Sequence, residues 1–185
     1  MKVYWGNASD DADSFVTASN SNREAGIGAV KQLARASTLA DVWVPLHGEI
    51  VRIPPAPSDF VGWFAETLLM RPRAAEVVAR IVGVAGELLP AHGGFERLWL
   101  LNCLVEVDAL DAEQTEFAYL PSGNFSHMPK MVFKPEVVDG LTIFKLSEPR
   151  RGDLYMTDLF VDAVRAAGLT GFGPKLEWDS EAAEG

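Results

Sequence analysis

The sequence has a single cysteine, Cys103, and only three histidines in 185 residues. One cysteine cannot form an internal disulfide and gives no Cys-x-x-Cys metal or redox motif. The fold therefore needs no oxidising compartment, and we expect a cytoplasmic protein. The N-terminal MKVYWGNASDD soon turns acidic and polar, so we expect no secretory signal peptide. No apolar run reaches the roughly 18 residues of a membrane-spanning helix, and we expect no membrane partner.

Positive charge is also scarce. Lys and Arg together number 16 against 26 Asp and Glu, which gives a formal net charge of −10. The only paired basic residues are Arg71 with Arg73, separated by Pro72, and Arg150 with Arg151. An acidic surface repels phosphate backbones unless a basic patch compensates. The composition therefore argues against a nucleic-acid partner and favours a soluble protein or the partner of something basic.

Familiar catalytic motifs are missing as well. Gly26-Ile27-Gly28 lacks the third glycine of a phosphate loop, and neither Gly-x-Ser-x-Gly nor His-Glu-x-x-His occurs. We expect no enzyme, no cofactor and no metal site. His47 and Glu49 lie two apart, so a strand would place both on one face, where they could share a proton. A solvated strand face is the favoured interpretation of that pair.

The remaining residues with reactive side chains have simple explanations. Cys103 lies in the apolar run RLWLLNCLVEV, where burial would leave its thiol inert. His92 neighbours two glycines and His127 lies in a loop, and no pair of histidines has the spacing of metal ligands.

The rest of the composition indicates a globular fold, because 48% of the residues are hydrophobic. Strand and helix patterns alternate without a regular βα rhythm, which predicts an α+β fold: a single domain with a mainly antiparallel sheet and a few flanking helices. The expected strands cover residues 1–5, 42–53, 87–90, 97–107, 131–133 and 141–146, with a last one near 176–178. Residues 42–53 can form either one half-buried strand or a hairpin. The expected helices cover residues 24–36, 72–82 and 158–167. Pro45 suggests that the strand containing it lies at a sheet edge.

Loops and boundaries follow from turn-forming residues. Residues 6–22 are rich in Ser, Asn and Asp and predict a long loop, residues 135–140 predict a turn, and the run PPAPSD at 54–59 is the best internal boundary. We therefore divide the chain into three parts. They are an N-terminal strand, loop and helix region at 1–57 that packs on the main body, an α+β domain at 58–180, and a frayed acidic tail at 181–185.

The clearest local signal is the C-terminal helix. Thr157 can cap a helix that begins at Asp158, with its apolar stripe formed by Leu159, Phe160, Ala163, Val164 and Ala167. Gly168 supplies the left-handed stop.

The densest acidic group lies in VEVDALDAEQTE and contains Glu106, Asp108, Asp111, Glu113 and Glu116. The spacing matches no Ca²⁺ loop and lacks its central glycine. A pair of catalytic carboxylates is an alternative. A docking surface for a partner, or simply a solvated rim, is the favoured interpretation.

Three stretches, in this order, resemble one bacterial family. They are SDFVGWFAETLLMRPRAAEVVARI, GELLPAHGGFERLWLLNCLVEVDALDAE and IFKLSEPRRGDLYMTDLFVDAVRAAGLTGFGPKLEW. Together they resemble the Imm11-type immunity protein family of polymorphic toxin systems, from about Ser58 to Trp178. The most specific part is IFKL, a spacer, LYMTDLFVDAV and GLTGF. The first fifty residues carry no resemblance, and Met70-Arg71-Pro72 stands where a polar helix start is expected.

The resemblance implies a protein that binds a bacterial toxin stoichiometrically and protects the producing cell, the toxin being encoded next door. It brings no catalytic residues. The matching residues are interpreted as scaffold: Gly168 and Gly171 form turns, Phe160 and Val164 pack, and Trp178 lies in the core. Two alternatives stay open. One is a small hydrolase that uses His47 and Glu49 or the carboxylates between Glu106 and Asp111, and the other is a module that pairs with itself.

Overall fold

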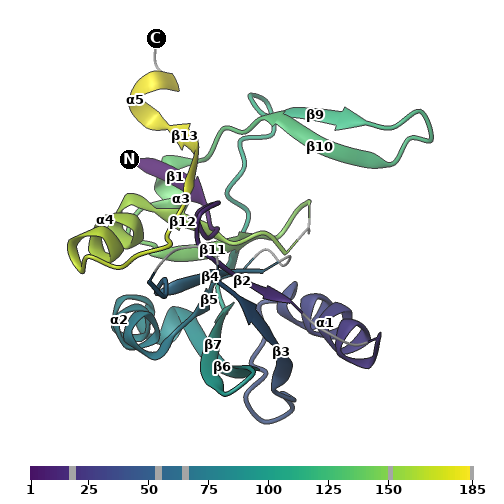
Figure 1. The fold of residues 1–185 in the computed structure, drawn as a ribbon. Helices are drawn as coiled ribbons and strands as arrows, with labels where there is room; N and C mark the ends of the chain where they lie inside the picture. Colours follow the sequence, from purple (N-terminus) through teal and green to yellow (C-terminus); the bar gives the residue numbers. More distant parts are fainter. Residues whose placement is uncertain (17–19, 53–55, 64–66, 150–151, 184–185) are drawn as a thin grey trace.

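The computed structural model describes residues 1–16, 20–52, 56–63, 67–149 and 152–183. Within them the chain forms a closed barrel, a five-stranded sheet and a separate two-stranded hairpin, flanked by helices (Figure 1). All strand pairs are antiparallel except β2–β4, β3–β6 and β8–β11. The predicted α+β class with mainly antiparallel pairing is therefore confirmed, although the strands divide between a barrel and a sheet.

The barrel is closed in the order β2-β3-β6-β7-β5-β4. Its strands are β2 (Asp13–Val16), β3 (Leu46–Val51), β6 (Gly86–Gly93), β7 (Glu96–Cys103), β5 (Leu69–Met70) and β4 (Phe60–Gly62). Its interior is an apolar cluster that includes Leu46, Leu89, Leu98 and Leu100. A Cβ atom on Gly48 would lie 2.5 Å from the Phe15 ring. Glycine is therefore required there, because the ring fills the space that a side chain would take.

The five-stranded sheet has the order β13-β1-β12-β11-β8. Its strands are β13 (Lys175–Asp179), β1 (Lys2–Trp5), β12 (Tyr155–Thr157), β11 (Ile143–Leu146) and β8 (Glu106–Val107). Alternate residues face two different cores. Tyr4 and Met156 pack towards the barrel and the helices at Pro72–Val82 and Asp158–Ala166. Val3 and Tyr155 pack towards the segment that carries the hairpin.

The helices are α1 (Asn20–Leu33), α2 (Pro72–Val82), α3 (Pro135–Val138), α4 (Asp158–Ala166) and α5 (Ser180–Ala183), with a 3₁₀ turn at Gly83–Ala85. α2 has the predicted bounds, because Pro72 is favourable at a first helical position. α4 begins where predicted and is followed by Gly168 with φ +61°. None of the helices in the described residues is long and apolar enough to cross a membrane.

The buried side of α4 differs in part from the prediction. Phe160 and Val164 are fully buried, and so is Val161, which the predicted stripe omits. Leu159 is wrongly placed in that stripe, since it is 54% exposed. Thr157 makes no capping bond: its hydroxyl donates to the carbonyl of Leu141 instead. Trp178 is buried in the core cluster that also contains Val3 and Tyr155, and Gly171 has φ +78°.

Three predictions of irregular or edge structure are wrong. Residues 6–22 contain β2 and the start of α1, and Thr17 to Ser19 of this stretch lie outside the described residues. β3 is no edge strand, because β2 and β6 pair with it on both sides; Pro45 lies just before it, and Ile53 lies outside the described residues. Residues 135–140 include the short helix α3.

One predicted strand is also wrong, and part of a predicted boundary is not described. Residues 131–133 form no ladder and make only the isolated bridge between Leu110 and Phe133. Pro54 and Pro55 of the boundary, the pair Arg150 and Arg151, and the last two residues of the acidic tail lie outside the described part of the chain. The rest of the tail begins in α5.

Strands before residue 57 pair with strands after it. β1 lies between β13 and β12, and β3 pairs with β6. The amino group of Lys145, on β11, donates to the carbonyl of Leu33 at the end of α1. Burial lowers the pKa of Lys145.

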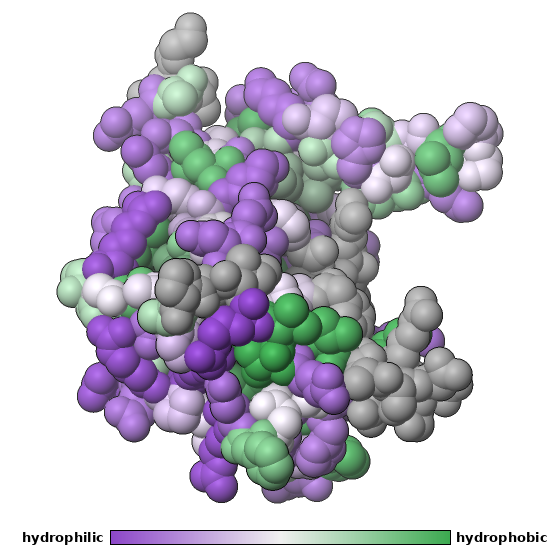
Figure 2. All heavy atoms as spheres, in the orientation of Figure 1, coloured by the Kyte–Doolittle hydropathy of each residue, from purple (hydrophilic) through white to green (hydrophobic). Residues whose placement is uncertain are grey.

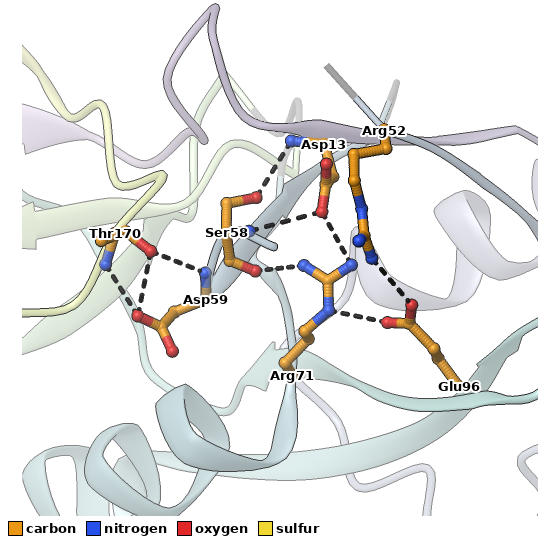
Figure 3. A network of polar contacts seen from close by, with 7 residues as sticks. All are labelled: Asp13, Arg52, Ser58, Asp59, Arg71, Glu96 and Thr170. Carbon is orange, nitrogen blue, oxygen red and sulfur yellow. Dashed lines mark hydrogen bonds and ion pairs between the residues drawn. The ribbon is translucent and has the colours of Figure 1, made fainter. Parts of the chain in front are cut away.

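A buried polar network joins the barrel to α2 (Figure 3). Arg71, at the start of α2, pairs through Nη2 with Asp13 at 2.7 Å and through Nε with Glu96 at 2.7 Å, and it also donates to the carbonyl of Ser58. Asp13 is fully buried. In the same region Asp59 accepts two hydrogen bonds from Thr170, at 2.9 and 3.1 Å. These contacts hold β2, β4, β7, α2 and the loop after α4 together.

Candidate partner-binding surface

A hairpin projects from the body of the molecule (Figures 1 and 2). It consists of β9 (Glu116–Tyr119) and β10 (Phe125–Lys130), and in the described residues these strands pair only with each other. We call residues 116–130 the arm. Each of its strands therefore leaves an outer edge without a neighbouring strand. Exposed strand edges of this kind present backbone donors and acceptors to a partner.

The arm is anchored at its base and exposed at its tip. At the base, Phe117 and Met128 pack against the core cluster that contains Val3, Tyr155 and Trp178. The buried hydroxyl of Thr115 donates to the carbonyl of Val132 at 3.2 Å and accepts from its N–H at 3.1 Å. At the tip, Tyr119 is 62% exposed and Leu120 is 50% exposed. The tip thus presents an aromatic and an aliphatic side chain to solvent.

Aromatic contacts order the arm internally. The ring of Phe125 lies edge-on to Phe117 at 6.4 Å and edge-on to Tyr119 at 6.2 Å. Edge-to-face pairs at such distances are attractive. A two-stranded hairpin is only marginally stable by itself, so these rings help to keep the exposed end of the arm in one conformation.

The acidic residues singled out in the sequence have different environments. Glu106 is in β8, half-buried and paired with Lys145 of β11 in the parallel ladder. Asp108 lies just beyond β8 and forms an ion pair with Lys134 at 3.1 Å. Glu113 and Glu116 are exposed, at the base and first position of the arm. The structure thus separates the first two from those that lead into the arm.

Asp111 shapes the loop before the arm. Its Oδ2 accepts from the side-chain amide of Gln114 at 2.6 Å, and its Oδ1 accepts from the backbone N–H groups of Glu113 and Gln114 at 2.9 and 3.1 Å. These hydrogen bonds, the one from the Gln114 side chain above all, lower the pKa of Asp111. Asp111 therefore holds the backbone that presents Glu113.

A cleft of about 240 Å³ lies where the arm meets the five-stranded sheet. The sheet side contributes Trp5, Asp153, Tyr155 and Glu177, and the arm side contributes His127, Met128 and Met131. Sequence reasoning missed this cleft, because its walls come from both ends of the chain and from its middle. Only the register that sets Trp5 opposite Tyr155 brings them together.

Two of the three histidines lie close together in the fold, although their spacing in the sequence suggests that all three are apart. His47 and His92 are in register on the parallel strands β3 and β6, and their rings stack with centroids 4.9 Å apart. Both His47 and Glu49 are exposed. Among the described residues, no three His, Cys, Asp or Glu side chains are grouped so that they could hold a metal ion.

Cys103 lies at the end of β7 with 1% of its surface exposed. Burial raises the pKa of its thiol. A buried neutral thiol is a poor nucleophile, so the geometry gives this residue a packing role.

Comparison with known families agrees with the resemblance found in the sequence. Residues 91–176 match the model of the immunity protein family Imm11. The match agrees with the suspected family, and the matched range contains β7, the acidic group, the arm and α4. No curated protein matches the chain.

Proposed function

We propose that this protein is an immunity protein that binds a cognate bacterial toxin and neutralises it stoichiometrically in the cytoplasm of the producing cell. The match of residues 91–176 to the Imm11 family carries the proposal. The geometry supports binding rather than catalysis: the thiol is buried, and the exposed His47 and Glu49 lie on an open strand face.

The arm and the acidic loop at its base form the proposed contact surface. Tyr119 and Leu120 supply apolar contact area at the tip, and aromatic anchors of this kind dominate the energy of protein interfaces. Glu106, Asp108, Asp111, Glu113 and Glu116 supply negative charge near the base. Asp108 shares its charge with Lys134, and Asp111 holds the loop. The exposed Glu113 and Glu116, which lead into the arm, are therefore the acids that we test as contacts of the partner.

The first experiment tests the function itself. The C-terminal region of the protein encoded by the adjacent gene is expressed in a tester strain with and without this chain, and survivors are counted. Binding is then measured by calorimetry. Rescue with one-to-one nanomolar binding supports the proposal, whereas toxicity without rescue or binding contradicts it.

Neutralising the two exposed acids should slow association with that toxin domain. For the double variant Glu113→Gln/Glu116→Gln we expect an association rate about fivefold lower at low salt, with a weaker dependence on ionic strength, because charges at an interface rim steer encounter. The double variant Glu49→Gln/Glu76→Gln makes the same change in net charge on β3 and α2. Stopped-flow rates that are equal for the two double variants would remove the acidic loop from the interface.

Replacing Tyr119 by alanine should weaken binding with little effect on the global free energy of unfolding, because the side chain is 62% exposed. We expect a loss of about 2 kcal/mol in binding free energy, since a tyrosine at the centre of an interface is a typical hot spot. The control is Phe95→Ala, which removes a fully exposed ring at the β6–β7 turn, far from the arm in Figure 1. Calorimetry with an unchanged affinity for Tyr119→Ala would show that the tip of the arm stays outside the complex.

A further inference from the structure

Two aromatic rings form one wall of the cleft between the arm and the sheet. Trp5 ends β1 and is directly opposite Tyr155 of β12 in the antiparallel ladder, so both side chains lie on the same face of the sheet. Tyr155 is buried and its hydroxyl donates to the sulfur of Met131 at 3.6 Å. Trp5 is half-buried. The tryptophan therefore keeps ring surface at the cleft that a ligand can contact.

Carboxylates lie beside these rings. Glu177, from β13, and Asp153, just before β12, both line the cleft. Oε1 of Glu177 pairs with Lys175 at 2.8 Å, but the Lys175 side chain is 68% exposed. An ion pair so open to water contributes little and exchanges readily. Another cation can therefore replace Lys175 at Glu177.

His127 and Met128 of the arm, with Met131 just beyond it, form the other side, and no lysine or arginine is among the described residues that line the cleft. Thioether sulfurs are polarizable and adapt to the shape of what they contact. At about 240 Å³ the cleft is smaller than the roughly 300–1,000 Å³ of drug-sized ligand pockets. Its size suits one long side chain.

We propose that this cleft binds an arginine side chain of the protein partner. A guanidinium is planar, so it can stack on the Trp5 ring while it donates to the Glu177 carboxylate, which a lysine ammonium does less well. Charge complementarity supports this occupant, because Glu177 lines the cleft, no lysine or arginine is among the described residues of the lining, and the whole chain carries −10. The identification of the partner as the toxin rests on the proposed function; the chemistry of the cleft does not.

The first test needs no toxin. Arginine amide is titrated into the full-length ¹⁵N-labelled protein, and the Trp5 indole N–H signal is followed by NMR. The control is citrulline amide, which keeps the α-amino group but has a neutral side chain of the same shape. We expect a saturating shift with arginine amide and none with citrulline amide. Equal shifts with both compounds would overturn the proposal.

Two variants make this titration specific. Glu177→Gln should weaken binding of arginine amide about fivefold or more, and Lys175→Gln should strengthen it about threefold, because it removes the competing cation. A gain of binding cannot arise from misfolding. The controls are Glu76→Gln on α2 and Lys31→Gln on α1, which change the same charges elsewhere. Affinities that follow net charge alone, equal in each variant and its control, would assign the effect to the general acidity of the protein and overturn the proposal.

The second test uses the toxin domain. We expect Glu177→Gln to lower its affinity about tenfold and Glu76→Gln to leave it unchanged. If the wild-type protein does not bind the domain, the proposed function fails, and the arginine amide titration alone decides the chemistry of the cleft. If the wild-type protein binds and the two variants bind equally, the function stands and the cleft is not part of the interface.

Discussion

Replacing Arg71 by methionine should lower the free energy of unfolding by about 3–5 kcal/mol, because it removes the Arg71 guanidinium from its ion pair with a buried carboxylate. Asp13 is fully buried and pairs with Arg71 at 2.7 Å. Arg71 also bonds Glu96 and the carbonyl of Ser58 (Figure 3). The measurement is equilibrium unfolding in urea, with the midpoint and slope compared with wild type.

Two further variants test the cause of that loss. Arg73→Met removes the neighbouring arginine, which pairs with Asp59 at 2.7 Å but is 59% exposed; it should cost less than about 1 kcal/mol. Asp13→Asn combined with Arg71→Met removes both charges and should be more stable than Arg71→Met alone, as expected for coupled residues. The explanation fails if Arg71→Met costs no more than Arg73→Met.

A Phe160→Ala variant should lose about 3–5 kcal/mol of unfolding free energy through the cavity that it leaves. Phe160 is fully buried on α4, and its ring lies edge-on to Phe172 at 6.1 Å. This cluster joins α4, α2 and the face of the sheet turned towards the barrel. Urea unfolding measures the loss.

The adjacent Leu159 provides the matched control for Phe160. Leu159 is 54% exposed, so Leu159→Ala should change stability by no more than about 0.5 kcal/mol. Both variants should bind the toxin domain like wild type while they are folded, since α4 is not part of the proposed surface. A loss below about 1 kcal/mol for Phe160→Ala would contradict the packing described for α4.

The starts and ends of helices can be predicted from residues close to them in the sequence. α2 starts at Pro72 as predicted, and α4 starts at Asp158 and ends before a glycine with positive φ. Proline at a first turn and glycine after a last turn act through the backbone of the helix itself. Such signals can be recognised without knowledge of the rest of the fold.

Strands and their partners cannot be predicted from nearby residues in the same way. The prediction for β7 begins one residue late and continues past Cys103 into β8. The expected strands include none of β2, β4, β5, β9, β10 and β12. β2 has four residues, and its partners are β3 and β4, which lie far along the chain. β9 and β10 are short, and their pairing shifts register between Phe125 and Lys130. Alternation is weak in such strands, and tertiary pairing decides them.

The acidic group illustrates the same division in the candidate site. The sequence places five carboxylates within eleven residues and says nothing of their neighbours. In the fold, Asp108 forms an ion pair with Lys134, and the Asp111 carboxylate accepts hydrogen bonds from backbone and side-chain N–H groups. Glu113 and Glu116 remain exposed beside the arm. Carboxylates that look equivalent in the sequence thus have different environments, because contacts in the fold settle which of them stay exposed.

The sequence alone determines the acidic character, the lack of known catalytic motifs and the family resemblance. It also predicts the bounds of α2 and the start of α4. These depend on composition, on contacts within one or two helical turns, and on the order of motifs. Only the tertiary structure decides that the strands close a barrel, that the arm stands free of the sheet, and that Trp5, Tyr155 and Glu177 share one cleft. Strand pairing joins residues distant in the chain, so no local pattern contains it.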